Sequence, residues 1–192
     1  MRTFVALDIE EAIRARIERF IEGVRGFAPD VRWVRPESLH VTLKFIGEKP
    51  IDAVEEIKHA LSRVKKTPFE IAFQGYGFFP GARSPRVFWI GIEAGPQLAE
   101  LGVSIDRELS TLGISKESHA FSPHLTLARA GSGSPRRSKA DGPNVRFQRL
   151  QEKLAAMPAL DFGTMTANEF FLYESKLSPK GSQYTKIARF PL

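Results

Sequence analysis

The chain contains no cysteine, no apolar run of about 18–20 residues and no GxxxxGK[ST] loop. Without cysteine there are no disulfides, no thiolate metal ligands and no cysteine nucleophile. The missing apolar run excludes a membrane-spanning helix, and the missing loop excludes a P-loop ATPase. The apolar patch near the N-terminus is too short for a signal peptide and has no small-residue cleavage site. We therefore expect a cytoplasmic protein that does not associate with membranes.

The composition of the 192 residues is that of a globular protein, with 42% hydrophobic and 26% charged residues and a net charge of +6. Much of the positive charge lies within residues 129–149, where Asp141 is the one acidic residue. The basic residues of this segment are Arg129, Arg136, Arg137, Lys139, Arg146 and Arg149. The Gly/Ser-rich stretch 130–143 within this segment predicts a mobile loop. Its charge is either an ordinary solvated surface or a flank that attracts a phosphate-bearing partner.

The hydrophobic periodicity predicts a mixture of helices and strands. Apolar residues at helical spacing predict helices over about 10–25, 51–66, 97–113 and 147–157, the last ended by Pro158. Stretches rich in Val, Ile, Phe and Tyr predict strands over 2–9, 31–35, 39–46, 69–79, 86–93, 123–128, 164–174 and 183–190. No regular βαβ alternation runs through this order, so we expect an α+β fold with mainly antiparallel sheets.

A short repeat is the most informative feature. His-Val-Thr-Leu at 40–43 recurs as His-Leu-Thr-Leu at 124–127, each in a predicted strand. By shuffling of this composition the pattern His-x-Thr-Leu is expected roughly 0.01 times. A single strand histidine is usually a hydrogen-bonded structural residue, but a repeated His-x-Thr favours a function. Two similar lobes, each contributing one such strand, explain the repeat.

Strict alternation along these strands predicts which side chains share a face. His40, Thr42 and Lys44 are expected on one face, with Val41, Leu43 and Phe45 on the apolar face. In the second copy His124, Thr126 and Ala128 are expected together, opposite Leu125 and Leu127. Each strand would then present an imidazole and a hydroxyl to a polar ligand.

Two imidazoles and two hydroxyls suit phosphoryl chemistry without a metal. One neutral histidine can act as a base while a protonated one acts as an acid near neutral pH. The hydroxyls of Thr42 and Thr126 can donate hydrogen bonds to non-bridging phosphate oxygens. Arg129, three residues after Thr126, is a candidate for a charge-assisted bond to the same phosphate, the alternative being an ordinary solvated residue.

The two tetrads, in the contexts LHVTLKFIGE (39–48) and FSPHLTLAR (121–129), resemble the two-histidine phosphoesterase superfamily. Within it the chain is most similar to the bacterial and archaeal RNA 2′,3′-cyclic phosphodiesterases, also called 2′-5′ RNA ligases. The opening RTFVALDI, the stretch GFFPGARSPRVFWIGIE (77–93) and the tail from Leu172 extend the resemblance over almost the whole chain. It departs at 130–143, where a Gly/Ser-rich run replaces a more compact segment.

This resemblance implies a single bilobal domain over 1–192, with two pseudo-symmetric lobes around a central cleft and helices outside. It implies opening of a terminal 2′,3′-cyclic phosphate to a 2′-phosphate, with His40 as proton donor and His124 as the base that activates water. Thr42, Thr126 and Arg129 match the phosphate-binding positions. The implied partner is RNA with 2′,3′-cyclic phosphate ends, tRNA fragments among them. We expect the protein to be a monomer and to need no cofactor or metal.

Several alternatives remain open at this level. The reverse reaction would join such an end to a 5′-hydroxyl through a 2′-5′ bond, and a non-catalytic RNA-binding or nucleotide-binding module could have kept the same cleft. His59 is expected on a helix surface, and His119 is either structural or close to the cleft. No HExxH or close histidine pair is present to favour zinc. An aromatic ring could stack the terminal base, with Phe4, Phe45, Phe78 and Tyr184 as candidates.

Overall fold

The computed structural model describes residues 1–131 and 145–192, which form two antiparallel sheets and four α-helices. The four-stranded sheet has the order β3-β1-β8-β9, and the five-stranded sheet the order β2-β6-β5-β4-β7. The strands are β1 (Arg2–Asp8), β2 (Val31–Trp33), β3 (His40–Glu48), β4 (Phe69–Phe79), β5 (Val87–Ala94), β6 (His124–Ala130), β7 (Asp161–Ala167), β8 (Glu169–Ser178) and β9 (Gly181–Pro191). The helices are α1 (Glu11–Val24), α2 (Ile51–Ser62), α3 (Pro96–Ser110) and α4 (Gln148–Ala155).

The α+β, two-lobed fold expected from the sequence is confirmed, with one His-x-Thr-Leu strand in each sheet. The four predicted helices are present because each has an apolar stripe to bury, as α1 does with Ile13, Ile17, Ile21 and Val24. The predicted loop 130–143 lies, from residue 132 on, outside the described residues, and so do Arg136, Arg137 and Lys139.

One predicted strand is wrong in its extent. The stretch 164–174 is divided between β7 and β8, with Asn168 between them. β7 pairs with β4 in the five-stranded sheet, whereas β8 pairs with β1 and β9 in the other. The chain therefore changes sheets at Asn168, and the hydrophobic pattern alone does not reveal such a change because both halves have strand character.

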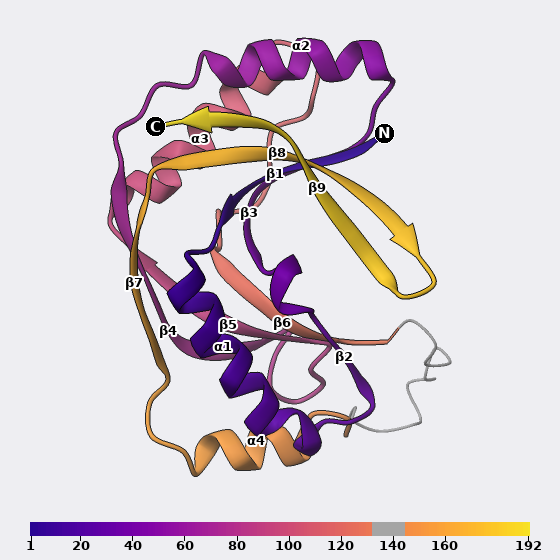
Figure 1. The fold of residues 1–192 in the computed structure, drawn as a ribbon, viewed down its shortest axis with the longest axis vertical. Helices are drawn as coiled ribbons and strands as arrows, with labels where there is room; N and C mark the ends of the chain where they lie inside the picture. The colour runs from indigo at the N-terminus through magenta and orange to yellow at the C-terminus, as the bar shows by residue number, and fades with distance from the viewer. Residues whose placement is uncertain (132–144) are drawn as a thin grey trace.

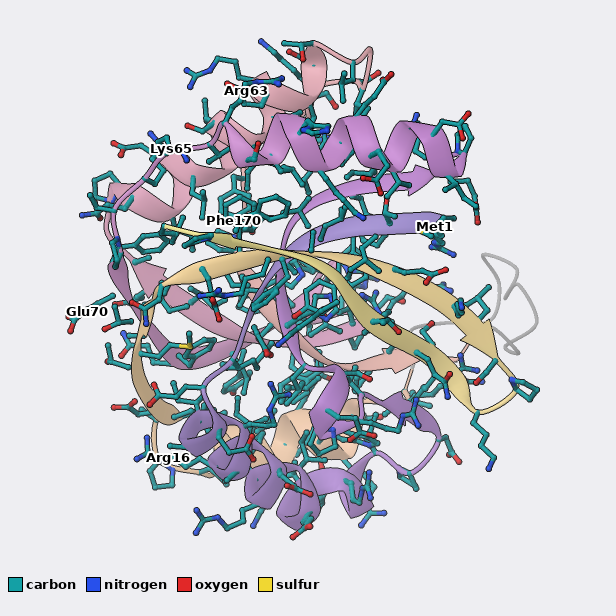
Figure 2. All side chains as sticks on the ribbon, turned by 45° about the horizontal axis from the view of Figure 1, so that its top comes forward. Met1, Arg16, Arg63, Lys65, Glu70 and Phe170 are labelled. Atoms are coloured by element: carbon teal, nitrogen blue, oxygen red, sulfur yellow. The ribbon has the colours of Figure 1, made fainter. Side chains whose placement is uncertain are left out.

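Each sheet is covered on its outer side by a pair of helices (Figure 1), and each pair includes one helix that follows a strand of the other sheet. α1 leaves β1 of the four-stranded sheet but packs against β7, while α3 leaves β5 of the five-stranded sheet but packs against β3 and α2. Phe170 of β8 lies on the helix-covered side of its sheet (Figure 2). It is buried there and stacks on Phe190, with the ring centroids 5.0 Å apart. One continuous apolar core consequently joins both sheets and all four helices.

Candidate active site

The two motif strands have the same irregularity at the same place. In the β1–β3 pair, Val5 lies opposite Lys44 and Ala6 opposite Thr42, so Leu43 is an extra residue in β3. In the β5–β6 pair, Phe88 lies opposite Ala128 and Trp89 opposite Thr126, which leaves Leu127 as the extra residue in β6. Such an extra residue is a β-bulge, and it reverses the alternation of side chains beyond it. The first seven residues of both strands accordingly share one sequence of half-buried, buried and exposed positions.

The bulge in β3 corrects the predicted faces. Lys44 does not share a face with His40 and Thr42: its side chain is buried and forms an ion pair with Asp106 of α3, at 2.6 Å between Nζ and Oδ1. Phe45 takes the position beside the histidine instead, 55% exposed and 5.9 Å from the Phe4 ring on which His40 also packs.

The bulge in β6 acts on Arg129. Strict alternation would place Arg129 on the buried face of Leu125 and Leu127, but after the bulge it is exposed on the face of His124 and Thr126. Arg129 and Phe45 thus occupy equivalent positions, each five residues after the motif histidine. The second lobe offers a cation where the first offers an aromatic ring.

Both histidines are held by the same hydrogen bond. Nδ1 of His40 lies 2.8 Å from the carbonyl oxygen of Ser38, and Nδ1 of His124 lies 2.8 Å from that of Ser122. Because a carbonyl only accepts, Nδ1 must carry the proton in both rings. Nε2 is therefore the nitrogen that can take up or give a proton. Ser-x precedes the histidine in both copies, but every residue carries the main-chain carbonyl that accepts here, so the sequence alone does not reveal this bond.

Aromatic side chains pack against each imidazole ring. His40 packs against Phe4, with ring centroids 4.8 Å apart, and edge-on against Tyr184 at 5.1 Å. His124 packs edge-on against Phe79 at 5.0 Å, with Trp89 at 6.3 Å. Trp89 lies across Gly77 of β4, where an added Cβ would come within 2.1 Å of the indole. These contacts restrict the rotation of both rings.

His40 is electrostatically coupled to the second motif. Burial lowers its pKa below the ordinary 6.5, the hydrogen bond that its Nδ1 donates to the Ser38 carbonyl partly opposes this, and the positive charges of Arg129 and His124 lower the pKa further. Asp8 opposes them by raising the pKa. The strands β3 and β6 are also in contact, so the two motifs lie close enough for these charges to act on His40.

A cavity of about 430 Å³ is lined by Thr42 and Phe45 from β3 and by His124 from β6. α3 and the segment 117–122 complete its wall, with His119 among the lining residues. His40 lines a separate cavity with Tyr173 and Tyr184. Nδ1 of His119 lies 3.1 Å from the hydroxyl oxygen of Ser118. His59 is exposed on α2, as expected. Of the four aromatic candidates for base stacking, Phe45 is the most exposed, since Phe4 is buried and Phe78 and Tyr184 pack against other rings.

Two further features concern metals and membranes. Among residues 1–131 and 145–192, no group of three or more His, Asp or Glu side chains is placed to hold a metal ion. In the same part of the chain no helix is long and apolar enough to cross a membrane.

Comparison with known proteins places these features in a family. The family described as LigT like phosphoesterase matches the chain twice, over residues 7–89 and 90–184, so that each match contains one motif. The RNA 2′,3′-cyclic phosphodiesterase of Archaeoglobus fulgidus is 34% identical over 190 residues, covering 99% of both chains. The enzyme of the same name from Thermotoga maritima is also 34% identical, over 96% of this chain and 91% of its own.

Solved structures agree with the sequence comparison. The protein TT0787 of Thermus thermophilus superposes with a TM-score of 0.77 at 29% identity, covering 100% of this chain and 98% of its own. Escherichia coli LigT complexed with 3′-AMP also gives 0.77, at 25% identity over 100% and 97% of the two chains. With two histidines presented from equivalent bulged strands and a double match along the sequence, this chain belongs to the LigT-like phosphoesterases and is an enzyme.

Proposed function

We propose that the protein hydrolyses the 2′,3′-cyclic phosphate at the end of an RNA to a 2′-phosphate, using His40 and His124 and no metal ion. The observation that carries the proposal is the matched presentation of the two imidazoles, each with Nδ1 bound to a main-chain carbonyl and Nε2 left for proton transfer. The relatives named RNA 2′,3′-cyclic phosphodiesterase support the choice of substrate. Both histidines come from one chain, so a monomer is the proposed active unit, with tRNA fragments among its RNA partners.

In the proposed reaction, Nε2 of His124 takes a proton from a water molecule as its oxygen attacks phosphorus. The bond between phosphorus and O3′ breaks, and protonated Nε2 of His40 gives its proton to that oxygen. One proton is taken up and one is released, and the phosphate remains on O2′. The distribution of acid and base between the two rings follows the family resemblance, since the two sites are alike in geometry.

The remaining proposed roles follow from the shared face of each strand. Thr42 and Thr126 would donate hydrogen bonds to non-bridging oxygens, where negative charge accumulates in the transition state. Arg129, turned to this face by the bulge, would add a charge-assisted bond. Phe45 would stack the terminal base, because its exposed ring lines the cavity beside Thr42.

The test is incubation of a short RNA ending in a 2′,3′-cyclic phosphate with the enzyme in EDTA. We expect a 2′-phosphate product, resolved chromatographically from the 3′-phosphate, and a loss of at least about a hundredfold in rate for His40→Ala and His124→Ala. His59→Ala is the matched control, since this histidine is exposed on α2. Full activity in either motif variant, or turnover that needs added metal, would overturn the two-histidine mechanism.

The reverse reaction uses the same groups with the roles of the rings exchanged, so the cleft can also join a cyclic phosphate end to a 5′-hydroxyl through a 2′-5′ bond. Water in large excess favours hydrolysis. An RNA carrying a 5′-hydroxyl, added to the same assay, measures the ligated fraction. Binding of the cyclic phosphate RNA without any product would instead identify a non-catalytic binding module.

A further inference from the structure

A second arginine lies beside Arg129 on the cleft-facing side of the five-stranded sheet. β2 pairs with the end of β6 that is farther from His124, and in this register Arg32 is directly opposite Arg129. Directly paired residues of antiparallel strands share a face, with Cβ atoms about 4.5–5.5 Å apart. Their neighbours Trp33 and Ala128 point the other way, into the core against Phe88. Both arginine side chains are exposed.

The two guanidinium groups are without a counter-charge in the described part of the chain. Among the ion pairs found in residues 1–131 and 145–192, none includes Arg32 or Arg129. On its other side Arg129 faces Val87 of β5, which is apolar. Like charges directly opposite one another destabilise a sheet. A charge on an edge strand discourages aggregation, but that purpose does not require a position opposite another arginine.

An anion between or beside the two side chains removes this repulsion, and the position of Arg32 indicates which anion. His124 lies at the start of β6, where it pairs with Gly91 of β5, whereas Arg32 lies on β2, the neighbour of β6 on its other side. Arg32 is therefore displaced from the histidines both along β6 and across the sheet. A single phosphate at the reacting position would be held by Arg129, and Arg32 would reach the next phosphate along the strand.

We propose that Arg32 binds the internucleotide phosphate next to the cyclic phosphate end, so that Arg32 and Arg129 hold consecutive phosphates of one RNA strand. This inference rests on the proposed function for the identity of the ligand. Arg32 then makes the enzyme prefer an oligonucleotide end over a mononucleotide 2′,3′-cyclic phosphate, which carries no second phosphate. A phosphate contact of this kind positions the strand without reading its sequence.

The test uses two stable product analogues, a fluorescently labelled oligonucleotide with a 2′-phosphate end and adenosine 2′-phosphate as a competitor, in EDTA. For Arg32→Ala we expect the oligonucleotide to lose roughly fivefold to tenfold more affinity than the mononucleotide. The slope of log K against log salt for the oligonucleotide should fall by about 0.7, the value for one phosphate contact on a single strand. Arg32→Lys should retain most of the affinity, because it keeps the charge.

Arg19→Ala is the matched control, because it removes one exposed arginine from α1, on the outer side of the sheet. An Arg32→Ala variant that behaves like this control would overturn the proposal and leave Arg32 as an edge-strand charge. Equal losses for both ligands would also overturn it, since Arg32 would then act on the terminal phosphate. Failure of the proposed function is distinguishable: the RNA would bind with the Arg32 dependence described, yet its cyclic phosphate would not be hydrolysed.

Discussion

At the scale of single residues, the proposed proton donor His40 lies in surroundings that disfavour its protonated form. Burial is the largest cause of the lowered pKa of His40, and the charges of Arg129 and His124 add to it. An anionic phosphate bound beside these groups compensates for their positive charge and so raises the pKa of His40 again. The acid would then gain its proton as the substrate binds, which links protonation to the presence of the correct ligand.

This coupling predicts a specific change in pH dependence. The alkaline limb of kcat/KM marks loss of the proton from the free enzyme's acid, so a lowered pKa of His40 places this limb at lower pH than an ordinary histidine would. Arg129→Gln removes a positive charge and should raise that pKa, moving the limb to higher pH while the rate falls about tenfold to a hundredfold. NMR titration of His40 in the free protein provides the same comparison without turnover. A limb that stays in place or moves to lower pH would contradict the coupling.

At the scale of secondary structure, a bulge in each motif strand decides what faces the cleft. One extra residue turns Lys44 inward and Phe45 outward, and the same step in β6 brings Arg129 outward. Inside, Lys44 also donates to the carbonyl of Ser115 at 2.7 Å and lies 3.5 Å from Glu117. The first motif strand is thus tied to α3 and to the segment that precedes the second motif.

We predict that Lys44→Met destabilises the protein by about 3 kcal/mol, because it leaves the carboxylate of Asp106 largely buried without its partner. The double variant Lys44→Met/Asp106→Asn should recover more than about 1 kcal/mol of this loss, since it removes the uncompensated charge. The asparagine oxygen can still accept the Glu117 N–H that Asp106 accepts at 2.9 Å. Urea unfolding of the two single variants and the double variant measures the coupling. Additive effects would show that the ion pair contributes nothing of its own.

The sequence predicts the elements well and their faces less well. The helices and most strands follow from hydrophobic spacing, and the motif residues follow from a repeat that needs no structure to be seen. The faces of Lys44 and Phe45 do not follow, because a bulge depends on the partner strand and leaves no break in the apolar pattern. Arg129 is a phosphate-binding candidate from its position three residues after Thr126 and from the resemblance, although simple alternation would turn it to the core.

At the scale of the whole molecule, the exchange of helices joins the two lobes. α1 and α3 each pack on the sheet to which the strand before them does not belong, and one apolar core extends across both sheets. Each sheet is therefore covered in part by a helix that continues from a strand of the other sheet, so unfolding of one sheet also disturbs the helices that cover the other. The geometry of a cleft built from two lobes depends on this shared core.

The exchange predicts that the two lobes unfold in a single transition. Both tryptophans, Trp33 and Trp89, lie in the five-stranded sheet, so their fluorescence reports that lobe alone. Leu61 is fully buried in α2, which covers the four-stranded sheet, and Leu61→Ala should cost about 2–5 kcal/mol through loss of packing. If the lobes are one cooperative unit, this distant substitution shifts the tryptophan fluorescence midpoint in urea as far as it shifts the midpoint by circular dichroism. Ile17→Ala in α1, which removes a buried side chain beside the five-stranded sheet, is the matched variant and should likewise move both midpoints together. A fluorescence midpoint that responds to Ile17→Ala but not to Leu61→Ala would mean that each lobe folds on its own and that the cleft is an interface between two separable units.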